Sequence, residues 1–324
     1  MTMEQDACSF ERLAPEVKAF LELVRKMPQP PISMKTYKAM RQFMASTLKN
    51  VERLLFSGAV EDITIPAPER SLPVRVYRPD SARACLPLVL YFHGGGWVLG
   101  DLDMEEDTCI ALARQTPCIV ASVDYALAPE RPYPAARDEC YAALVWASLH
   151  GDEVGADKGQ IAVAGQSAGG NLAAVTAMMS RDLGGPAIAF QALFYPATSL
   201  GDDPTPSRKA FGEGFFLNAG DMKGITSMYV PDERERRHPY VSPLLAPDLT
   251  RLPPALIITA GCDPLRDEGE AYARRLSGAG VKADVLRFDD MIHAFLFLFK
   301  SSDSSRRAIE KTALALREAF GCPA

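Results

Sequence analysis

Short apolar runs alternate with runs of helical composition along most of this chain, and this alternation is the feature that most limits its fold. From Leu72 onward, the apolar runs are rich in Val, Ile and aromatic residues. Strands are expected at 72–79, 87–93, 118–125, 161–164, 187–196, 255–263 and 283–288. Helices are expected at 104–115, 136–151, 171–179, 266–277 and 305–320. The pattern predicts an α/β fold with a mostly parallel central sheet and helices on both faces.

Two segments do not follow this alternation. Residues 1–58 contain two amphipathic helical patterns that the breaker MPQPPIS separates, and residues 201–249 are rich in proline, glycine and charge. Ligands of open α/β sheets bind outside the carboxyl ends of the strands. We therefore expect an N-terminal helical cap at 1–58 and a main domain at 59–324 that carries a cap insertion at about 201–249.

The composition argues against several kinds of partner and location. A net charge of −6 without a basic block disfavours nucleic acid or an anionic membrane as the main partner. The first residues are acidic where a secretory signal would be basic, and no apolar run predicts a membrane span. Seven cysteines without metal-ligand spacing predict reduced thiols in a cytoplasmic protein, with Cys109 and Cys118 in the core.

One serine lies between small residues in the sequence AVAGQSAGGNLA at 162–173, where an expected strand meets an expected helix. Residues 165–169 match the G-x-S-x-G turn, in which a tight bend exposes the serine hydroxyl. Glycines are needed there because a Cβ would collide with the neighbouring strand and helix. Ser167 is therefore a candidate nucleophile. A plain turn with a bystander serine is the alternative.

The sequence YFHGGGW at 91–97 follows an expected buried strand. Three successive glycines free the backbone to direct N–H groups at one point, as an oxyanion hole requires. The expected donors are the N–H groups of Gly94 and Gly95, together with that of Ala168 after the serine. A loop that is merely flexible would contain the same glycines.

A serine nucleophile needs a base, and the chain has only four histidines. His93 lies inside the glycine loop, His150 at an expected helix end, and His238 in the charged run DERERRHPY. His293, in FDDMIHAF, follows the last expected strand and is the candidate base. A surface histidine in that loop is the alternative.

The acid of such a triad lies between the nucleophile and the base along the chain. Asp263 follows the apolar run ALIITAGC and is the candidate acid. Asp267 and Glu268 compete with it, but they fall in the first turn of the next expected helix, where acids suit the helix dipole. Asp289 and Asp290 are too close in sequence to the base to be preferred.

These motifs, together with DYALAPERPYPAA, SPLLAPDLTRLPPALI and DPLRDEG, resemble the hormone-sensitive-lipase-like branch of the α/β-hydrolases. Within this branch, the motifs are most similar to those of bacterial carboxylesterases and acetyl esterases. The likeness runs from about residue 70 to the C-terminus. It implies an α/β-hydrolase fold and a serine carboxylesterase that hydrolyses short-chain acyl esters through an acyl-enzyme. The triad and the oxyanion-hole donors would be the residues named above.

The resemblance also implies a small-molecule ester substrate, and no metal or organic cofactor is implied. A homodimer would be unsurprising from the resemblance, although the sequence does not show one. An amide hydrolase such as an arylformamidase, or a lipase, would use the same triad, whereas a non-catalytic receptor of this fold would lack the base. Apolar cap residues are candidates to line the substrate pocket, although ordinary packing explains them equally well. They are Phe20, Phe43, Phe211, Phe215 and Phe216.

The chain departs from the pattern of this branch at several positions. Gln166 stands where an acid usually precedes the serine, and Ala126 replaces an arginine. After VLGDLD, the usual Thr-His-Asp becomes Met104, Glu105 and Glu106. We expect these changes to alter the pocket and the hydrogen bonds of the serine turn, and to leave the reaction class intact.

Overall fold

An eight-stranded sheet forms the centre of the part of the chain that the computed structural model describes, which is residues 10–27, 30–48, 52–81, 85–201 and 204–322. The strand order is β1-β2-β4-β3-β5-β6-β7-β8. β2 pairs antiparallel with both β1 and β4, and the remaining pairs are parallel, which confirms the expected sheet. The strands are β1 (Ala59–Pro66), β2 (Ser71–Arg78), β3 (Leu86–Phe92), β4 (Ile119–Val123), β5 (Ala156–Gln166), β6 (Phe190–Phe194), β7 (Ala255–Cys262) and β8 (Ala283–Ile292).

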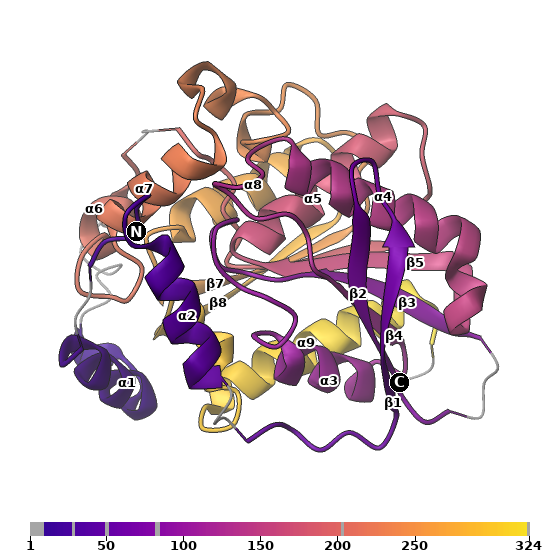
Figure 1. Ribbon diagram of the computed structural model, residues 1–324, viewed down its shortest axis with the longest axis horizontal. Coiled ribbons are helices and arrows are strands. Elements are labelled where there is room, and N and C mark those ends of the chain that lie inside the picture. Colours follow the sequence, from indigo (N-terminus) through magenta and orange to yellow (C-terminus); the bar gives the residue numbers. More distant parts are fainter. Residues whose placement is uncertain (1–9, 28–29, 49–51, 82–84, 202–203, 323–324) are drawn as a thin grey trace.

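Helices cover both faces of this sheet (Figure 1). α4 (Ala135–His150), α5 (Ala168–Asp182) and α8 (Arg266–Gly278) lie on one face, and α3 (Glu106–Gln115) and α9 (Asp303–Ala319) lie on the other. The expected arrangement of helices on both faces is therefore confirmed. Short 3₁₀ helices lie at Phe10–Arg12, Gly151–Val154, Glu233–Arg237, Pro243–Leu245 and Phe295–Leu298.

Two hydrophobic cores result, one on each face. In β3, Leu88, Leu90 and Phe92 pack into the core under α4, α5 and α8, whereas Val89 and Tyr91 pack into the core under α3 and α9. Neighbouring side chains of a strand point to opposite faces, so a strand that is buried on both faces is apolar throughout. This explains the continuous apolar run of β3.

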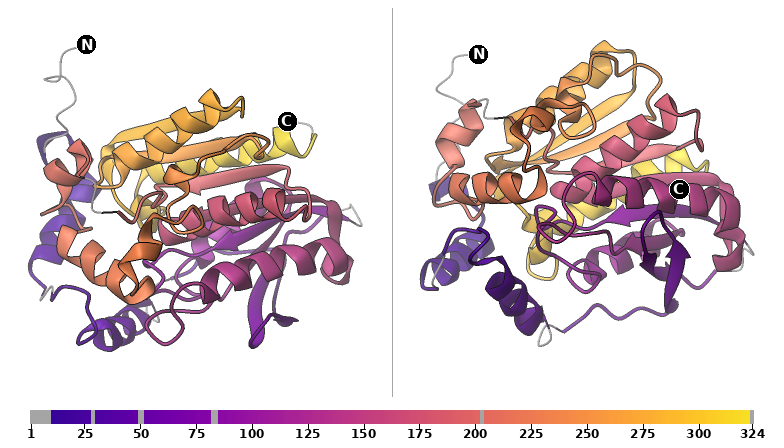
Figure 2. Two further views of the ribbon diagram at one scale, coloured as in Figure 1. Left: turned by 90° about the horizontal axis from the view of Figure 1, so that it is seen from above. Right: turned by 45° about the horizontal axis from the view of Figure 1, so that its top comes forward.

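Four further helices gather at one end of the sheet, as both Figure 1 and Figure 2 show. α1 (Pro15–Arg25) and α2 (Tyr37–Leu48) come from the N-terminal segment, and α6 (Pro206–Phe211) and α7 (Ala219–Tyr229) come from the segment between β6 and β7. No described helix has the length and apolar content that crossing a bilayer requires.

The two distant segments contact each other directly. The Ile32 N–H donates to Asp221 Oδ1 over 2.8 Å. The rings of Phe20 and Phe216 meet edge to face with their centroids 5.3 Å apart. Residues that lie about 190 positions apart in the chain therefore share one small helical layer.

The turn between β5 and α5 leaves no room for side chains at its glycines. A Cβ at Gly165 would lie 2.3 Å from the Gly169 carbonyl oxygen, and a Cβ at Gly169 would lie 1.9 Å from the Phe92 oxygen. These distances are far below any real carbon–oxygen contact, and the obstructing atoms are backbone. The expected reason for the glycines, a collision with the neighbouring strand and helix, is confirmed.

Gly169→Ala should therefore lower the free energy of unfolding by about 3 kcal/mol or more, because β3 or α5 must shift to admit the methyl group. Urea unfolding followed by circular dichroism measures this change. The matched control is Gly278→Ala, where nothing lies within 4 Å of the added Cβ. Equal unfolding midpoints for the two variants would contradict the prediction.

The cysteines only partly match the expectation of reduced thiols. Cys109 and Cys118 are free and buried, as expected. Cys262, at the end of β7, is disulfide-bonded, and its partner lies outside the described residues. The expectation is thus wrong at Cys262, because the spacing of cysteines along a chain does not tell which thiols meet in the fold.

Candidate active site

The three residues expected to form a triad lie at equivalent positions of the sheet. Ser167, Asp263 and His293 each follow the last residue of a strand, namely β5, β7 and β8. Cys262 pairs with Ile292 at the end of the β7–β8 ladder, so the next residues on both strands leave the sheet at the same level. The carboxyl ends of parallel strands share one edge, which is where open α/β sheets bind ligands.

The structure brings the three side chains into one line of hydrogen bonds. The His293 Nδ1 lies 2.8 Å from Asp263 Oδ2, and its Nε2 lies 2.9 Å from Ser167 Oγ. A carboxylate cannot donate, so the Nδ1–H donates to Asp263 and Nε2 accepts from the serine hydroxyl. Asp263 is fully buried and His293 is 5% exposed. The histidine is thereby oriented to take a proton from Ser167.

Ser167 occupies a strained backbone conformation, with φ 52° and ψ −114°. Its N–H donates to the Phe194 oxygen over 2.9 Å, and its own carbonyl accepts from the N–H groups of Asn171 and Ala197. These bonds to β6, to α5 and to the chain after β6 hold a conformation that is costly for a residue with a side chain. The result is a hydroxyl presented at the sheet edge.

The glycine loop has two N–H groups that no described hydrogen bond engages, and one of them, that of Gly95, is an expected donor. The Gly94 N–H donates to Glu105 Oε1 over 3.3 Å, so it is committed to a buried carboxyl group. Within the described part of the chain, no hydrogen bond engages the N–H groups of Gly95, Gly96 or Ala168. The expectation therefore fails to fit at Gly94, and Gly96 takes its place as a candidate donor.

His93 shapes this loop and is not a second base. Its ring stacks on Tyr125 with centroids 4.1 Å apart, and its Nδ1–H donates to the Gly94 oxygen over 2.7 Å. Complete burial lowers the pKa of His93 to about 4, which keeps the imidazole neutral. His150 and His238 lie elsewhere, beside Glu153 and the Tyr240 N–H respectively.

Sequence reasoning did not single out Tyr195, which also belongs to this site. Tyr195 follows the last residue of β6, as the triad residues follow their own strands, and its backbone φ is 36°. Its ring packs on His293 edge to face, with centroids 5.0 Å apart. A polar aromatic residue at the carboxyl end of a buried strand was the signal that could have identified it.

Four of the five phenylalanines that were candidates to line the pocket contact another phenylalanine ring, and the fifth is half exposed. Phe211 is buried and packs against Phe215 at 5.3 Å, and Phe216 packs against Phe20 at the same distance. Phe43 is 50% exposed. The candidates therefore form two ring pairs, Phe211 with Phe215 and Phe20 with Phe216, and Phe43 belongs to neither pair.

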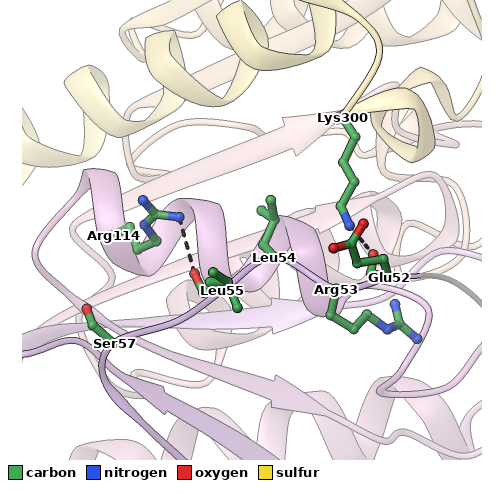
Figure 3. A pocket seen from close by; sticks show the side chains of 7 residues that line it. All are labelled: Glu52, Arg53, Leu54, Leu55, Ser57, Arg114 and Lys300. Carbon is green, nitrogen blue, oxygen red and sulfur yellow. Dashed lines mark hydrogen bonds between the residues drawn. The ribbon is translucent and has the colours of Figure 1, made fainter.

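An open cavity of about 540 Å³ lies away from the triad, between the chain at 52–57, α3 and the loop before α9 (Figure 3). Its basic side chains are already engaged. Lys300 donates to the Glu52 carbonyl oxygen, and Arg114 donates to the Leu55 carbonyl oxygen over 3.3 Å. None of the triad residues lines this cavity.

A serine held on a strained strand–helix turn, with its base and acid at the ends of later strands, defines the class of α/β-hydrolases. A family model described as alpha/beta hydrolase fold matches residues 89–297. The chain belongs to this family, in its hormone-sensitive-lipase-like branch.

Similar proteins cover most of the chain. Carboxylic ester hydrolase LipN of Mycobacterium tuberculosis is 44% identical over 264 residues, which are 80% of this chain and 70% of LipN. Ethyl acetate hydrolase of Pseudomonas putida is 32% identical over 88% of this chain and 92% of its own length. The crystal structure of a thermostable esterase from Pseudomonas putida ECU1011 matches with a TM-score of 0.91 and 37% identity, over 95% of this chain and 98% of that chain.

Proposed function

We propose that this protein is a serine carboxylesterase that hydrolyses short-chain acyl esters through an acyl-enzyme intermediate. The observation that carries the proposal is the hydrogen-bonded line from Asp263 through His293 to Ser167. The hydrolase relatives support the substrate class.

In the first half-reaction, Ser167 Oγ attacks the ester carbonyl carbon while its proton passes to His293 Nε2. The tetrahedral intermediate then breaks its bond to the alcohol oxygen, which takes the proton from His293 and leaves. In the second half-reaction, water attacks the acyl group as His293 removes its proton. Ser167 Oγ leaves with that proton, which returns the enzyme to its starting state. Asp263 accepts the Nδ1–H throughout and so holds the imidazole in the required tautomer.

The negative oxygen of each tetrahedral intermediate would lie against the N–H groups of Gly95, Gly96 and Ala168. Ala168 is the first residue of α5, so its N–H also carries the positive end of the helix dipole. Donors that are fixed before the reaction stabilise developing charge without reorganisation.

The helices at 15–48 and 206–229 form the proposed cap over this site. The α7 residue Ile225 is buried and lies so close to Gly96 that a Cβ there would come within 2.7 Å of Ile225 Cδ1. An apolar side chain held against the proposed oxyanion loop leaves little room for a long chain. This geometry favours acyl groups of a few carbons.

A series of p-nitrophenyl esters tests the size preference. We expect kcat/KM to be at least about 10-fold higher for acetate or butyrate than for palmitate. Ile225→Ala should shift the preference toward longer chains, because it removes the side chain over the loop. The control Leu183→Ala changes a residue that is 61% exposed and should leave the profile unchanged. A maximum at palmitate in the wild type would contradict the proposal.

An amide hydrolase or lipase would use the same residues, and aryl formamides and triglyceride emulsions in the same assay distinguish these activities. A non-catalytic receptor is disfavoured by the presence of His293 in hydrogen-bond contact with Ser167. A fluorophosphonate probe should label Ser167 in the proposed enzyme, and absence of labelling would favour a receptor.

The proposed setting of the enzyme is the cytoplasm, where the disulfide of Cys262 is unusual, and its proposed form is a homodimer. β8 is an edge strand of the sheet, and Val285 on it is 44% exposed. Unpaired strand edges readily pair with a second chain. Cell fractionation and size-exclusion chromatography with light scattering test these two statements separately.

A further inference from the structure

Two residues that depart from the usual pattern of this branch meet in the folded chain. Gln166 immediately precedes Ser167, and Glu105 lies 61 residues earlier, before α3. The Gln166 Nε2 donates to Glu105 Oε2, and each of the two residues is only 1% exposed. The departures therefore form one buried pair directly behind the site.

The carboxyl group of Glu105 contacts both loops that carry the proposed chemistry. Its Oε1 accepts the Gly94 N–H of the glycine loop over 3.3 Å. Its Oε2 accepts from Gln166 on the serine turn and from the Tyr91 hydroxyl over 3.2 Å. One rigid group thus spans the gap between the nucleophile turn and the loop of the oxyanion donors.

The amide of Gln166 continues this network toward the base. Its Nε2 also donates to the Tyr91 hydroxyl over 2.7 Å, and its Oε1 accepts from the Tyr195 hydroxyl. The Tyr195 ring packs on His293 with centroids 5.0 Å apart. The network therefore reaches from the glycine loop, through the residue before the nucleophile, to the ring beside the base.

Glu105 is a buried carboxyl group with a raised pKa. Burial raises its pKa to about 7, Asp101 adds to this effect, and the Gly94, Tyr91 and Gln166 donors oppose it. Within the described residues, no lysine or arginine forms an ion pair with Glu105. A buried carboxyl group without a cation is costly to fold, and a neutral side chain would fill the same space at lower cost. Such groups occur preferentially at functional sites.

We propose that Glu105 is a positioning residue that fixes the glycine loop relative to the serine turn, with Gln166 as its partner. Its Oε1 holds Gly94, so the next two N–H groups, of Gly95 and Gly96, stay directed at the oxygen of the substrate on Ser167. This role rests on the proposed esterase function and adds the element that aligns its two halves.

Glu105→Gln tests the role with almost no change of volume. An amide has one acceptor oxygen, so it can accept from Gly94 or from Gln166 but not from both, and its NH₂ would face a donor. Displacement of a donor by a fraction of an ångström should lower kcat for p-nitrophenyl butyrate by about 10-fold to 100-fold. KM should change by less than about 3-fold, because the ground-state ester makes few of these contacts.

The double variant Glu105→Gln/Gln166→Glu separates pairing from simple packing. It restores one carboxyl group and one amide in contact, and the amide oxygen at position 105 is then free to accept from Gly94. We expect kcat to recover to within about 5-fold of the wild type. The control is Glu106→Gln, the same change one residue later, where the carboxylate pairs with Arg53 at 3.4 Å. It should leave kcat within 2-fold.

Wild-type kcat in Glu105→Gln would overturn the positioning role, and so would a double variant no better than the single one. Rates of fluorophosphonate labelling at Ser167 provide a second measure that needs no ester substrate. A wild-type protein that is labelled but hydrolyses no ester would contradict the proposed function, while slower labelling in Glu105→Gln would still uphold the positioning role. If both variants fail to fold by circular dichroism, Glu105 is structural and the proposal is overturned.

Discussion

In the Ser167→Ala variant, kcat for p-nitrophenyl butyrate is expected to fall by roughly 10⁴-fold to 10⁶-fold. In the proposed mechanism, Ser167 Oγ is the atom that forms the acyl bond, and the base that activates it is His293, whose Nε2 lies 2.9 Å away. The remaining rate would come from substrate binding and from the backbone donors. Steady-state kinetics on the purified variant, with thermal unfolding to show an intact fold, measure the effect.

A matched control for this experiment is Ser148→Ala. Ser148 lies on α4, which carries none of the three triad residues, and donates to the Val145 oxygen over 2.7 Å. Its kcat should stay within 2-fold of the wild type. Turnover of Ser167→Ala within 10-fold of the wild type, in a protein free of contaminating esterase, would end the acyl-enzyme mechanism.

Asp263→Asn should lower kcat by about 10⁴-fold, although it changes only one atom of a buried side chain. The carboxylate accepts from His293 Nδ1–H over 2.8 Å and also from the Leu265 N–H over 2.8 Å. An amide that donates to Nδ1 would leave the hydrogen on Nε2, which could then not accept the serine proton. Pre-steady-state acylation kinetics should show that the first half-reaction is slowed.

The control for this change is Asp267→Asn, four residues later. Asp267 accepts from the Ser207 N–H over 2.7 Å and, in the part of the chain that the structure describes, forms no hydrogen bond with a triad residue. It should keep near wild-type turnover. Because the triad acts as a unit, Ser167→Ala/Asp263→Asn should be no slower than Ser167→Ala alone. A further loss of 100-fold in the double variant would show that Asp263 acts independently of Ser167.

Much of the fold could be predicted because buried parallel strands are apolar on both faces and the helices between them are amphipathic. The missed strand was β1. Its exposure is high at almost every position, since it lies at the edge of the sheet and pairs only with β2. An edge strand lacks the apolar signal on which the other predictions depended, so local sequence did not distinguish it from a loop.

The candidate triad residues could be proposed because Ser167 and Asp263 follow apolar strands, His293 follows the last expected strand, and the chain order of the fold limits the choices. The glycine loop was harder. Which of three successive N–H groups points into the site depends on the backbone angles of Gly95 and Gly96, both of which have positive φ. The contact of Gly94 with Glu105 depends on tertiary structure that no local pattern encodes.

The pairing of Glu105 with Gln166 illustrates the same limit. Each departure was visible in the sequence, but their contact spans 61 residues and exists only after β3, α3 and β5 have packed. The disulfide of Cys262 is a similar case, because the spacing of cysteines along the chain did not predict it. Local periodicity predicts elements well, and it carries no information about which distant side chains meet.

The proposed cap consists of two segments from distant parts of the chain, and the two segments contact each other. Exchanging residues 10–48 alone for those of a relative without an aromatic residue at position 20 would leave Phe216 without the ring that it now contacts. Exchanging both segments together would keep each segment with a partner from the same relative. It would not change Ser167, Asp263 or His293, which follow β5, β7 and β8. If the proposed cap selects the substrate, its two segments must change together, while the strand-end residues that carry the proposed chemistry stay the same.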